Sequence, residues 1–347
     1  GDTPFVQTET LENMCAALET NDVVVLGFDA ADPARYGRLV MQGDSLDRIV
    51  EYKDATDQER AITLCNSGVV ACKSDLLFDL IDAVGNDNAS EEYYLTDIIG
   101  IARERGLKAT AVTCDEAETM GVNSRVDLAA ADAAFQSRAR AAMLEDGITL
   151  MAPETVYFAR DTYIGRDTVI EPNVVFGPGV TIESGATIRA FSHLEGCHVA
   201  RGGVIGPYAR LRPGAELSED VRIGNFVEVK NAQIAEGAKV NHLSYIGDAT
   251  IGAKANIGAG TITCNYDGVM KHHTHIGANA FIGSNTMLVA PVHIGDGAMT
   301  GSGSVITSDV EADALALARA HQVEKPGMAR KLLEMLKAKK AKQQRGS

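Results

Sequence analysis

The chain has 347 residues, of which 45% are hydrophobic and only 5% aromatic, and its formal net charge is −15. This length allows two domains with separate cores, and no apolar run approaches the roughly 18 residues of a membrane span. Residues 1–150 hold 12 Lys and Arg against 28 Asp and Glu. Such an acidic half argues against nucleic-acid binding, which needs a basic surface.

The first part of the chain, residues 1–125, mixes strand and helix patterns and is expected to form an α/β domain. An apolar strand is predicted over residues 22–28, and helices are predicted over 11–19, 76–84 and 94–105. Residues 126–147 are rich in Ala at helical spacing and are predicted to form a linker helix. The six cysteines of the chain include no CxxC pair, which indicates reduced thiols and a cytoplasmic protein.

From Ile164 onward an aliphatic residue, replaced only by Phe176 and Thr300, returns at every sixth position, with three shorter steps of five residues and one interruption between Ile257 and Ile276. The anchors of this pattern are Ile164, Ile170, Phe176, Ile182, Ile188, Leu194, Val199, Ile205, Leu211, Leu217, Ile223, Val229, Ile234, Val240, Ile246, Ile251, Ile257, Ile276, Ile282, Leu288, Ile294, Thr300 and Ile306. A six-residue period fits neither an α-helix nor an amphipathic strand. It is typical of short strands joined by tight corners, three to a coil, with coils stacked about 4.8 Å apart.

The repeat therefore predicts an all-β parallel β-helix over residues 148–310. Gly often follows the anchor directly, as at Gly165, Gly224, Gly247 and Gly283, and is expected to relax the corner. The remaining residues, 311–347, form a tail interrupted by Pro, and a basic helix is predicted over 329–342.

Stacking of the coils brings charged residues together. Leu211 and Val229 fall on one face in neighbouring coils, so Arg212 and Lys230 should lie about 5 Å apart. Two adjacent cations repel each other unless an anion lies between them, which makes this pair a candidate phosphate clamp. The alternative is two solvated surface charges that point apart.

The same count aligns the hexads of Ile223 and Val240 and stacks Glu228 on Tyr245. His242 lies in the second of these hexads, at an outward position. A carboxylate one coil away can hold a histidine in one tautomer as a general base. An ordinary surface histidine is the alternative.

The segment 263–275 breaks the period and is predicted to leave the β-helix as a loop, where repeat proteins tend to carry function. Its His272, His273 and His275 raise the possibility of a metal site. We disfavour that site, since all three lie in one loop and no acidic partner is close in sequence. The lone Cys264 is expected to be inert.

Three strings carry a resemblance to a known family: R-L-R-P-G-A-E-L at 210–217, I-G-N-F-V-E-V-K at 223–230 and N-I-G-A-G-T-I-T-C-N-Y-D-G at 256–268. They resemble bacterial bifunctional enzymes of UDP-N-acetylglucosamine synthesis, which join a glucosamine-1-phosphate acetyltransferase to an N-acetylglucosamine-1-phosphate uridyltransferase. The resemblance covers nearly the whole chain. It implies a left-handed β-helix, a homotrimer with active sites between subunits, and acetyl transfer from acetyl-CoA to glucosamine 1-phosphate.

By this resemblance, His242 is the general base and Glu228 orients it. Sugar-phosphate contacts are implied at Arg212, Lys230, Tyr245, Asn256, Asn265 and Lys271. Acetyl-CoA contacts are implied at Ala259, Tyr266, Ser284, Ser302 and Arg319. Ser284 is also expected to help stabilise an oxyanion.

Residues 1–125 resemble the later part of the uridyltransferase domain, through the strings Y-G-R (36–38), I-V-E-Y-K-D-A (49–55), N-S-G-V (66–69), E-Y-Y-L-T-D (92–97) and G-V-N-S-R (121–125). The resemblance implies UDP-sugar contacts at Gly37, Glu51, Asn66 and Asn123, and Mg²⁺ ligands at Asp2 and Asn123. The glycine-rich nucleotide loop of the family would lie upstream of Gly1. We therefore expect this chain to lack uridyltransferase activity.

Two other functions stay open. One is a hexapeptide sugar acyltransferase with a different acceptor, and the other is a trimeric scaffold without catalysis. Neither a nucleic acid nor a membrane is an expected partner.

Overall fold

The computed structural model describes residues 3–122 and 124–345. Its contacts divide the chain into two units, Gly1–Ala134 and Phe135–Ser347. Helix α5 (Arg125–Glu145) runs across this division. Within the described ranges, every helix is too short or too polar to cross a lipid bilayer.

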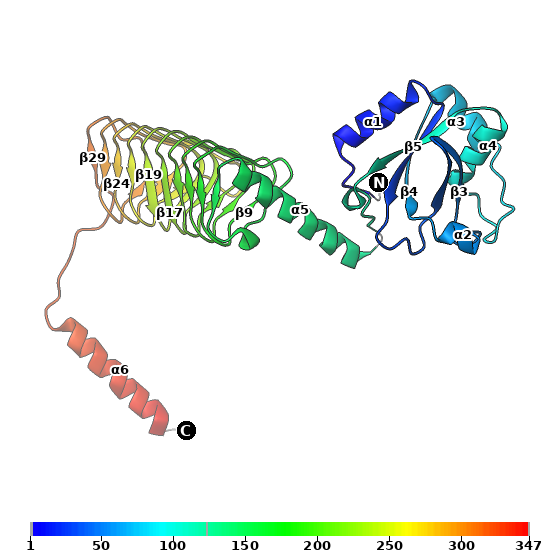
Figure 1. The fold of residues 1–347 in the computed structure, drawn as a ribbon. Helices are drawn as coiled ribbons and strands as arrows, with labels where there is room; N and C mark the ends of the chain where they lie inside the picture. The colour runs from blue at the N-terminus through cyan, green and yellow to red at the C-terminus, as the bar shows by residue number, and fades with distance from the viewer. Residues whose placement is uncertain (1–2, 123, 346–347) are drawn as a thin grey trace. The chain divides into compact units, whose positions relative to one another are not determined.

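The first unit is built on a five-stranded mixed sheet in the order β3–β2–β4–β1–β5 (Figure 1). The strands are β1 (Val23–Asp29), β2 (Arg38–Gln42), β3 (Ser45–Val50), β4 (Leu64–Cys72) and β5 (Ala109–Cys114). The helical segments are α1 (Thr8–Leu18), α2 (Asp57–Arg60), α3 (Ser74–Ile81), η1 (Leu95–Asp97), α4 (Ile98–Glu104) and η2 (Glu116–Glu118). The expected α/β class is confirmed.

Strand β1 is buried from Val23 to Phe28 because its run of apolar residues is covered on both faces. It runs antiparallel to β4 and parallel to β5. On one face Met14 of α1 packs with Val24 and Leu26. On the other, residues of α4 join the cluster that contains Val23. The central strand is thus held between two helical layers.

The end of α5 covers the first coil of the second unit. Gln136 is buried, and its Nε2 donates to the Phe158 carbonyl while its Oε1 accepts from the Phe158 N–H, both at 2.9 Å. These bonds satisfy the main chain of Phe158 on the side where no earlier coil is available to pair with it. Its ring stacks on that of Phe176, with centroids 5.3 Å apart.

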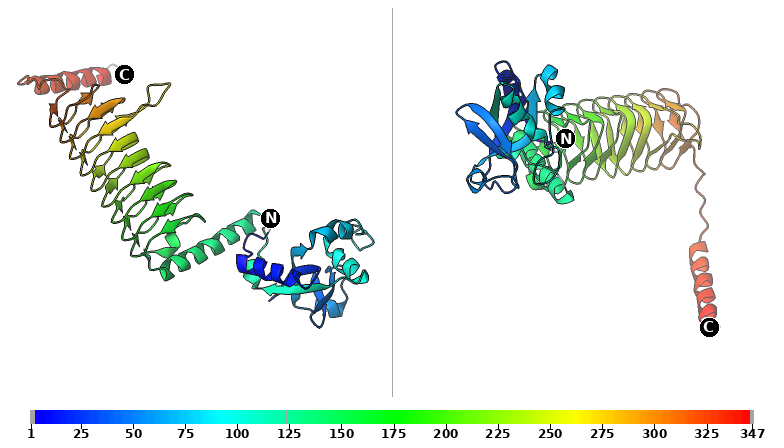
Figure 2. Two further views of the ribbon diagram at one scale, coloured as in Figure 1. Left: turned by 90° about the horizontal axis from the view of Figure 1, so that it is seen from above. Right: turned by 90° about the vertical axis from the view of Figure 1, so that its right-hand side faces the viewer.

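The second unit is the expected left-handed parallel β-helix, with strands of successive coils stacked along one axis (Figure 2). Its first face is a ten-stranded sheet of β6 (Thr149–Leu150), β8 (Val169–Ile170), β11 (Thr187–Ile188), β14 (Val204–Ile205), β17 (Arg222–Asn225), β19 (Lys239–His242), β21 (Asn256–Ile257), β24 (Phe281–Ile282), β27 (Met299–Thr300) and β29 (Leu315–Ala316). A short turn, η3 (Pro153–Thr155), follows β6.

The other two faces share one fourteen-stranded sheet, because two long strands bend around the corner between them. The bent strands are β18 (Glu228–Ile234) and β20 (Tyr245–Ile251). The second face contains β9 (Val175–Phe176), β12 (His193–Leu194), β15 (Arg210–Leu211), β22 (Ile262–Cys264), β25 (Met287–Val289) and β28 (Val305–Ile306). The third contains β7 (Tyr163–Ile164), β10 (Thr181–Ile182), β13 (Cys197–Val199), β16 (Ala215–Leu217), β23 (Thr274–Ile276) and β26 (Val292–Ile294).

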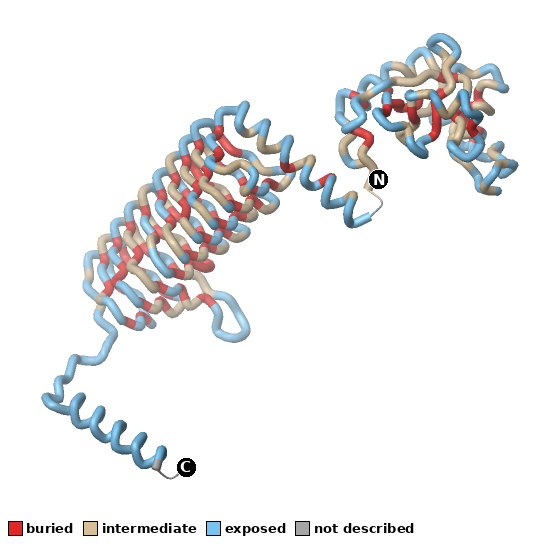
Figure 3. The backbone as a smooth tube through the Cα atoms, turned by 60° about the horizontal axis from the view of Figure 1, so that its bottom comes forward, coloured by how far each residue is buried: buried red, intermediate tan, exposed pale blue. Residues whose placement is uncertain are grey.

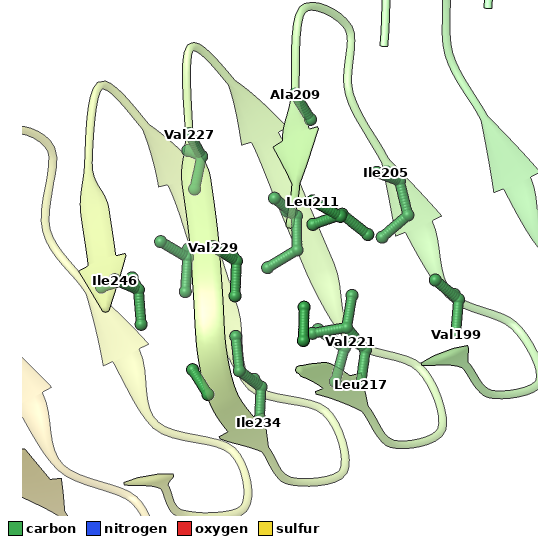
Figure 4. Close-up of a cluster of buried hydrophobic side chains, with 14 of the residues drawn as sticks. Val199, Ile205, Ala209, Leu211, Leu217, Val221, Val227, Val229, Ile234 and Ile246 are labelled. Atoms are coloured by element: carbon green, nitrogen blue, oxygen red, sulfur yellow. The ribbon is translucent and has the colours of Figure 1, made fainter. Parts of the chain in front are cut away.

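The core of the β-helix is a single column of aliphatic side chains. Every anchor of the six-residue pattern is buried, and burial alternates with exposure along each coil (Figure 3). In the close-up, Leu211, Val229 and Ile246 come from neighbouring coils and contribute to the same cluster (Figure 4). Each anchor therefore packs against its counterparts one coil above and below.

The glycines that follow the anchors have a different role from the one expected. At Gly165, Gly224, Gly247 and Gly283 the φ angle is not in the left-handed region. Instead, a Cβ at Gly165 would lie 2.6 Å from Ser184 N, and one at Gly283 would lie 2.5 Å from Ser302 N. These positions need Gly because the next coil passes too close for any side chain.

The left-handed corners are occupied in part by large residues. Phe191, Tyr208, Phe226 and Leu243 all have φ between 51° and 61° and are exposed. The first three rings stack at 4.9 and 5.2 Å between centroids. They form a ladder along the corner between the first and second faces, which we call the aromatic corner. Beyond the β-helix, the tail ends in α6 (Met328–Arg345), whose described side chains are all exposed.

Candidate active site

His242 lies at the end of β19, on the first face beside the aromatic corner. Asn225 occupies the same place one coil earlier, and its Oδ1 is 2.8 Å from His242 Nδ1. When this oxygen accepts from Nδ1–H, the neutral ring leaves Nε2 able to accept a proton. A pocket of about 300 Å³ opens here, lined by both residues together with Arg189, Arg222 and Asn241 among others.

The expected partner of His242 is engaged elsewhere in this chain. Glu228 Oε1 accepts from Arg212 Nη1 at 2.8 Å, across the corner from His242. This hydrogen bond raises the pKa of Arg212. Asn225, which the sequence reasoning missed, takes the place next to the imidazole. The same coil count would have found it, since Asn225 and His242 each come two residues after their anchors.

The register predicted for the second face is confirmed. Leu211 pairs with Val229, so Arg212 and Lys230 follow in neighbouring coils, and Glu228 pairs with Tyr245. The Tyr245 ring folds back over Gly247, where a Cβ would lie 2.6 Å from Cζ. Arg212 is bonded to Glu228, and a second cation lies close to Lys230.

That cation is Lys271. Its pKa is lowered, mainly because its ammonium group interacts directly with that of Lys230. The two chain segments are distant in sequence, and the predicted loop brings them together. Two neighbouring ammonium groups can bind an anion with several oxygens, such as a phosphate.

Lys271 is carried by a hairpin that leaves the β-helix after β22. Tyr266 and Lys271 form its antiparallel bridge. Asp267 accepts from the N–H groups of Val269 and Met270 at the turn, and its Oδ2 lies 2.7 Å from His272 Nε2. The contact with His272 lowers the pKa of Asp267 to about 2. The expectation that no acidic partner is close in sequence was therefore wrong, since Asp267 comes five positions before His272.

The other two loop histidines turn to the third face. His273 Nε2 is 2.9 Å from Thr250 Oγ1, and the His273 and His275 rings are 4.4 Å apart. Burial lowers the pKa of His273. Over residues 3–122 and 124–345, no group of three or more His, Cys, Asp or Glu side chains is placed to bind a metal ion.

Four of the five residues expected to contact acetyl-CoA lie along the edge of the first face, and Tyr266 lies in the hairpin instead. Ala259, Ser284 and Ser302 each follow their anchors by two residues, as His242 does, and the anchors pair in register. Main-chain bonds connect the line, from Gly260 N to His242 O and from Asn285 N to Ala259 O. At its far end Arg319 Nη1 donates to Ser302 O at 2.7 Å. We call this row the coil-edge line.

Three of the remaining predicted residues lie at defined places around these groups. Asn256 begins β21 on the first face, one coil beyond Lys239. Asn265 is buried at the base of the hairpin, where its carbonyl accepts from His272 N at 2.8 Å. Tyr266 is exposed, and its hydroxyl donates to Gly268 O.

In the first unit, Gly37, Glu51 and Asn66 lie together. Asn66 N donates to Gly37 O at 2.8 Å, and a Cβ at Gly37 would lie 3.2 Å from Glu51 Oε1. Glu51 also accepts from Thr96 Oγ1 and lines a pocket of about 390 Å³. The expected Mg²⁺ ligands Asp2 and Asn123 fall outside the described residues.

Comparison with known proteins gives consistent matches. The model of the bacterial transferase hexapeptide (six repeats) family matches residues 161–196 and 273–308. The bifunctional protein GlmU of a Ruegeria species is 70% identical over 346 residues, covering 100% of this chain and 77% of that protein. GlmU of Roseobacter denitrificans is 75% identical, with the same coverage.

Among solved structures, a UDP-N-acetylglucosamine O-acyltransferase of Moraxella catarrhalis covers 53% of this chain and 76% of its own. Its identity is 18% and its TM-score 0.32, and these values are too low to bear on function.

Proposed function

The chain belongs to the family of the bifunctional protein GlmU, and on this premise we propose that it transfers the acetyl group of acetyl-CoA to the amine of glucosamine 1-phosphate. It is an acyltransferase built on hexapeptide repeats, in a family that also includes nucleotidyl transfer. The product of the proposed reaction, N-acetylglucosamine 1-phosphate, would serve UDP-N-acetylglucosamine synthesis.

The coil-edge line is the observation that supports this reaction best. His242 stands at one end and Arg319 beyond the other, with Ala259, Ser284 and Ser302 between them. Small side chains at every intermediate position leave room along the edge for an extended ligand. Three coil steps of about 4.8 Å each give roughly 14 Å, a length suited to a thioester arm that ends at the histidine.

In the proposed reaction, His242 acts as the general base. As the sugar amine attacks the thioester carbonyl, a nitrogen-bound proton passes to Nε2, which the Asn225 contact leaves available. Ser284 is proposed to stabilise the oxyanion of the tetrahedral intermediate. When that intermediate collapses, the thiol of coenzyme A leaves and the proton on His242 returns to its sulfur.

The sugar phosphate is proposed to bind across the aromatic corner from the histidine. Lys230 and Lys271 offer adjacent ammonium groups for the phosphate, and Arg212 lies one coil away in the second face. Tyr245, Asn256 and Asn265 are proposed to position the sugar and its amine. Glu228, bonded to Arg212 in this chain, would reach His242 only from a neighbouring copy.

The first prediction concerns the acceptor. We expect the purified chain to consume acetyl-CoA when glucosamine 1-phosphate is present. The paired lysines predict that glucosamine without phosphate will be a poorer acceptor, with kcat/KM lower by at least about 100-fold. Release of free coenzyme A thiol measures both reactions. If no amino-sugar phosphate is turned over, the alternative of a trimeric scaffold without catalysis is favoured. If another acceptor reacts faster, glucosamine 1-phosphate is not the preferred substrate.

The second prediction concerns assembly. The base and the cation pair lie on two faces that meet at the exposed aromatic corner, so we propose a trimer in which one copy supplies His242 and the next supplies Lys230. When His242→Ala and Lys230→Ala subunits are refolded together, about a quarter of the sites should regain both groups. Acetyl transfer should reappear in the mixture at about that fraction, while each variant alone stays inactive. A mixture as inactive as its components would contradict a shared site.

The third prediction concerns uridylyl transfer. Across residues 3–122 and 124–345, no glycine-rich turn joins a strand to a helix in the way that triphosphate sites require. We expect no pyrophosphate release from UTP and N-acetylglucosamine 1-phosphate, with or without Mg²⁺, from a preparation active in acetyl transfer. Release by chain of verified mass would show that these residues suffice for the second reaction.

A further inference from the structure

The carboxylate of Asp248 has no part in the chemistry described so far. Asp248 is 8% exposed and lies where β20 bends between the second and third faces. Its Oδ1 accepts from Asn231 Nδ2 at 2.6 Å, and its Oδ2 accepts from Asn265 Nδ2 at 2.5 Å. Asn231 belongs to the preceding coil, and Asn265 begins the hairpin on the following one. The carboxylate is thus held between two amides.

The backbone at this corner favours Gly over Asp. Asp248 has φ of 48° and Asn231 has φ of 44°, both in the left-handed region. Gly196 and Gly214 occupy this corner in earlier coils, with φ of 51° and 82°. A glycine would therefore make the turn with less strain. The turn itself therefore does not explain why an aspartate occupies position 248.

Its hydrogen bonds fix the orientation of Asn265. An ionised carboxylate only accepts hydrogen bonds, so the NH₂ group of Asn265 must face Asp248 and its Oδ1 must face away. Asn265 also accepts from His272 N through its main-chain oxygen, which ties the two ends of the hairpin together. The Asp248 contact therefore fixes both the Asn265 amide and the base of the hairpin that carries Lys271.

The negative charge of Asp248 also offsets the positive charges of Lys230 and Lys271. Burial alone would raise the pKa of Asp248, but the Asn231 and Asn265 bonds and the charges of Lys271 and Lys230 outweigh burial and lower it. In return, the negative charge of Asp248 counteracts the effect of Lys230 on the pKa of Lys271. Asp248 therefore favours the charged form of Lys271.

We propose that Asp248 is a positioning residue for the acetyl acceptor, which holds the Asn265 amide and the Lys271 hairpin in place beside Lys230. Its role is indirect, because its buried oxygens are occupied by two amides of the chain itself. The identity of the acceptor rests on the proposed function. The contacts of Asp248 with Asn231 and Asn265 do not depend on that function.

Two variants remove the charge. Asp248→Asn keeps the shape of the side chain, and Asp248→Gly gives the corner the residue that suits its conformation, so at least one is expected to fold. In both, KM for glucosamine 1-phosphate should rise about tenfold while kcat changes less than about threefold. KM for acetyl-CoA should stay at its wild-type value. Asp220→Asn is the matched control, since Asp220 is an exposed corner residue with φ of 56°.

A second measurement does not depend on acetyl transfer. Modification of Lys271 and Lys230 by an amine-reactive reagent, followed by mass spectrometry, reports how much of each lysine is uncharged. Both Asp248 variants should react faster at Lys271 than wild type, because the loss of the carboxylate lowers the pKa of that lysine further. Inorganic phosphate should protect the two lysines in wild type and in Asp220→Asn, and protect them less in the Asp248 variants.

Wild-type KM together with wild-type protection in both Asp248 variants would overturn the proposal. A fall in kcat at unchanged KM would also overturn it, since that pattern belongs to a residue acting in the chemical step. If the wild-type chain does not acetylate glucosamine 1-phosphate, the proposed function fails. The lysine modification experiment would then still decide whether Asp248 holds the cation pair.

Discussion

Replacement of His242 by Ala is expected to lower kcat for acetyl transfer by about 10²–10⁴-fold, the range typical of a lost general base. KM for both substrates should change little, because the ring lies at the end of the coil-edge line and the phosphate is proposed to bind elsewhere. Asn225 contacts one of the two ring nitrogens of the imidazole, Nδ1. Asn225→Ala should therefore retain part of the activity and fall between wild type and His242→Ala.

Stopped assays of coenzyme A release at saturating concentrations of both substrates measure this effect. His293→Ala is a suitable control, since His293 is an exposed strand residue of the third face. Equal rates for His242→Ala and wild type would remove His242 from the mechanism.

Gly224→Ala is expected to damage both the fold and the site. Its Cβ would lie 2.6 Å from the carbonyl carbon of Asn241 and 2.8 Å from the Asn241 Cα. These are main-chain atoms of the next coil and have little room to move. Overpacking of this kind costs about 1–3 kcal/mol or more of unfolding free energy. It would also separate β17 from β19 where Asn225 meets His242, so kcat should fall further than stability predicts.

Gly177→Ala provides the matched control, because Gly177 also follows its anchor directly. There the nearest atoms to a new Cβ are the Cβ of Glu195 at 3.1 Å and the carbonyl oxygen of Leu194 at 3.3 Å, so the coils need to separate by only a few tenths of an ångström. Thermal unfolding should show a clearly lower midpoint for Gly224→Ala and a small change for Gly177→Ala. If both variants unfold at the wild-type temperature, the close approach of the coils at Gly224 has been overestimated.

Much of the fold could be predicted because the β-helix repeats one local rule. An aliphatic residue at every sixth position must point inward once the coils stack, and this single condition located all the anchors. The residues at the corners were harder to predict from the sequence. Thr250 comes four residues after Ile246, a position that buried alanines such as Ala186 and Ala209 take in other coils, yet it is only half-buried and contacts His273. The five-residue step between Ile246 and Ile251 shifts its direction, and a pattern based on six residues misses that shift.

The site was predictable where it follows the coils. Register alone placed Glu228 beside Tyr245 and located Lys230 one coil from Arg212. Register could not predict contacts that depend on the length of a side chain or on the path of the hairpin. Arg212 bonds Glu228, and Lys271 of the hairpin comes close to Lys230. No periodic pattern in the sequence indicates that the hairpin folds back toward the second face.

The coil-edge line also determines the distance between the two ends of the site. Each coil contributes one residue to it, so the separation between His242 and Ser302 is set by the number of coils between them, at about 4.8 Å per coil. Insertion of a complete coil would lengthen the track by one step without disturbing the packing rule, and loss of a coil would shorten it. Thus a β-helix of this kind can change the length of ligand it accommodates in whole steps, while the chemistry at the histidine end stays the same.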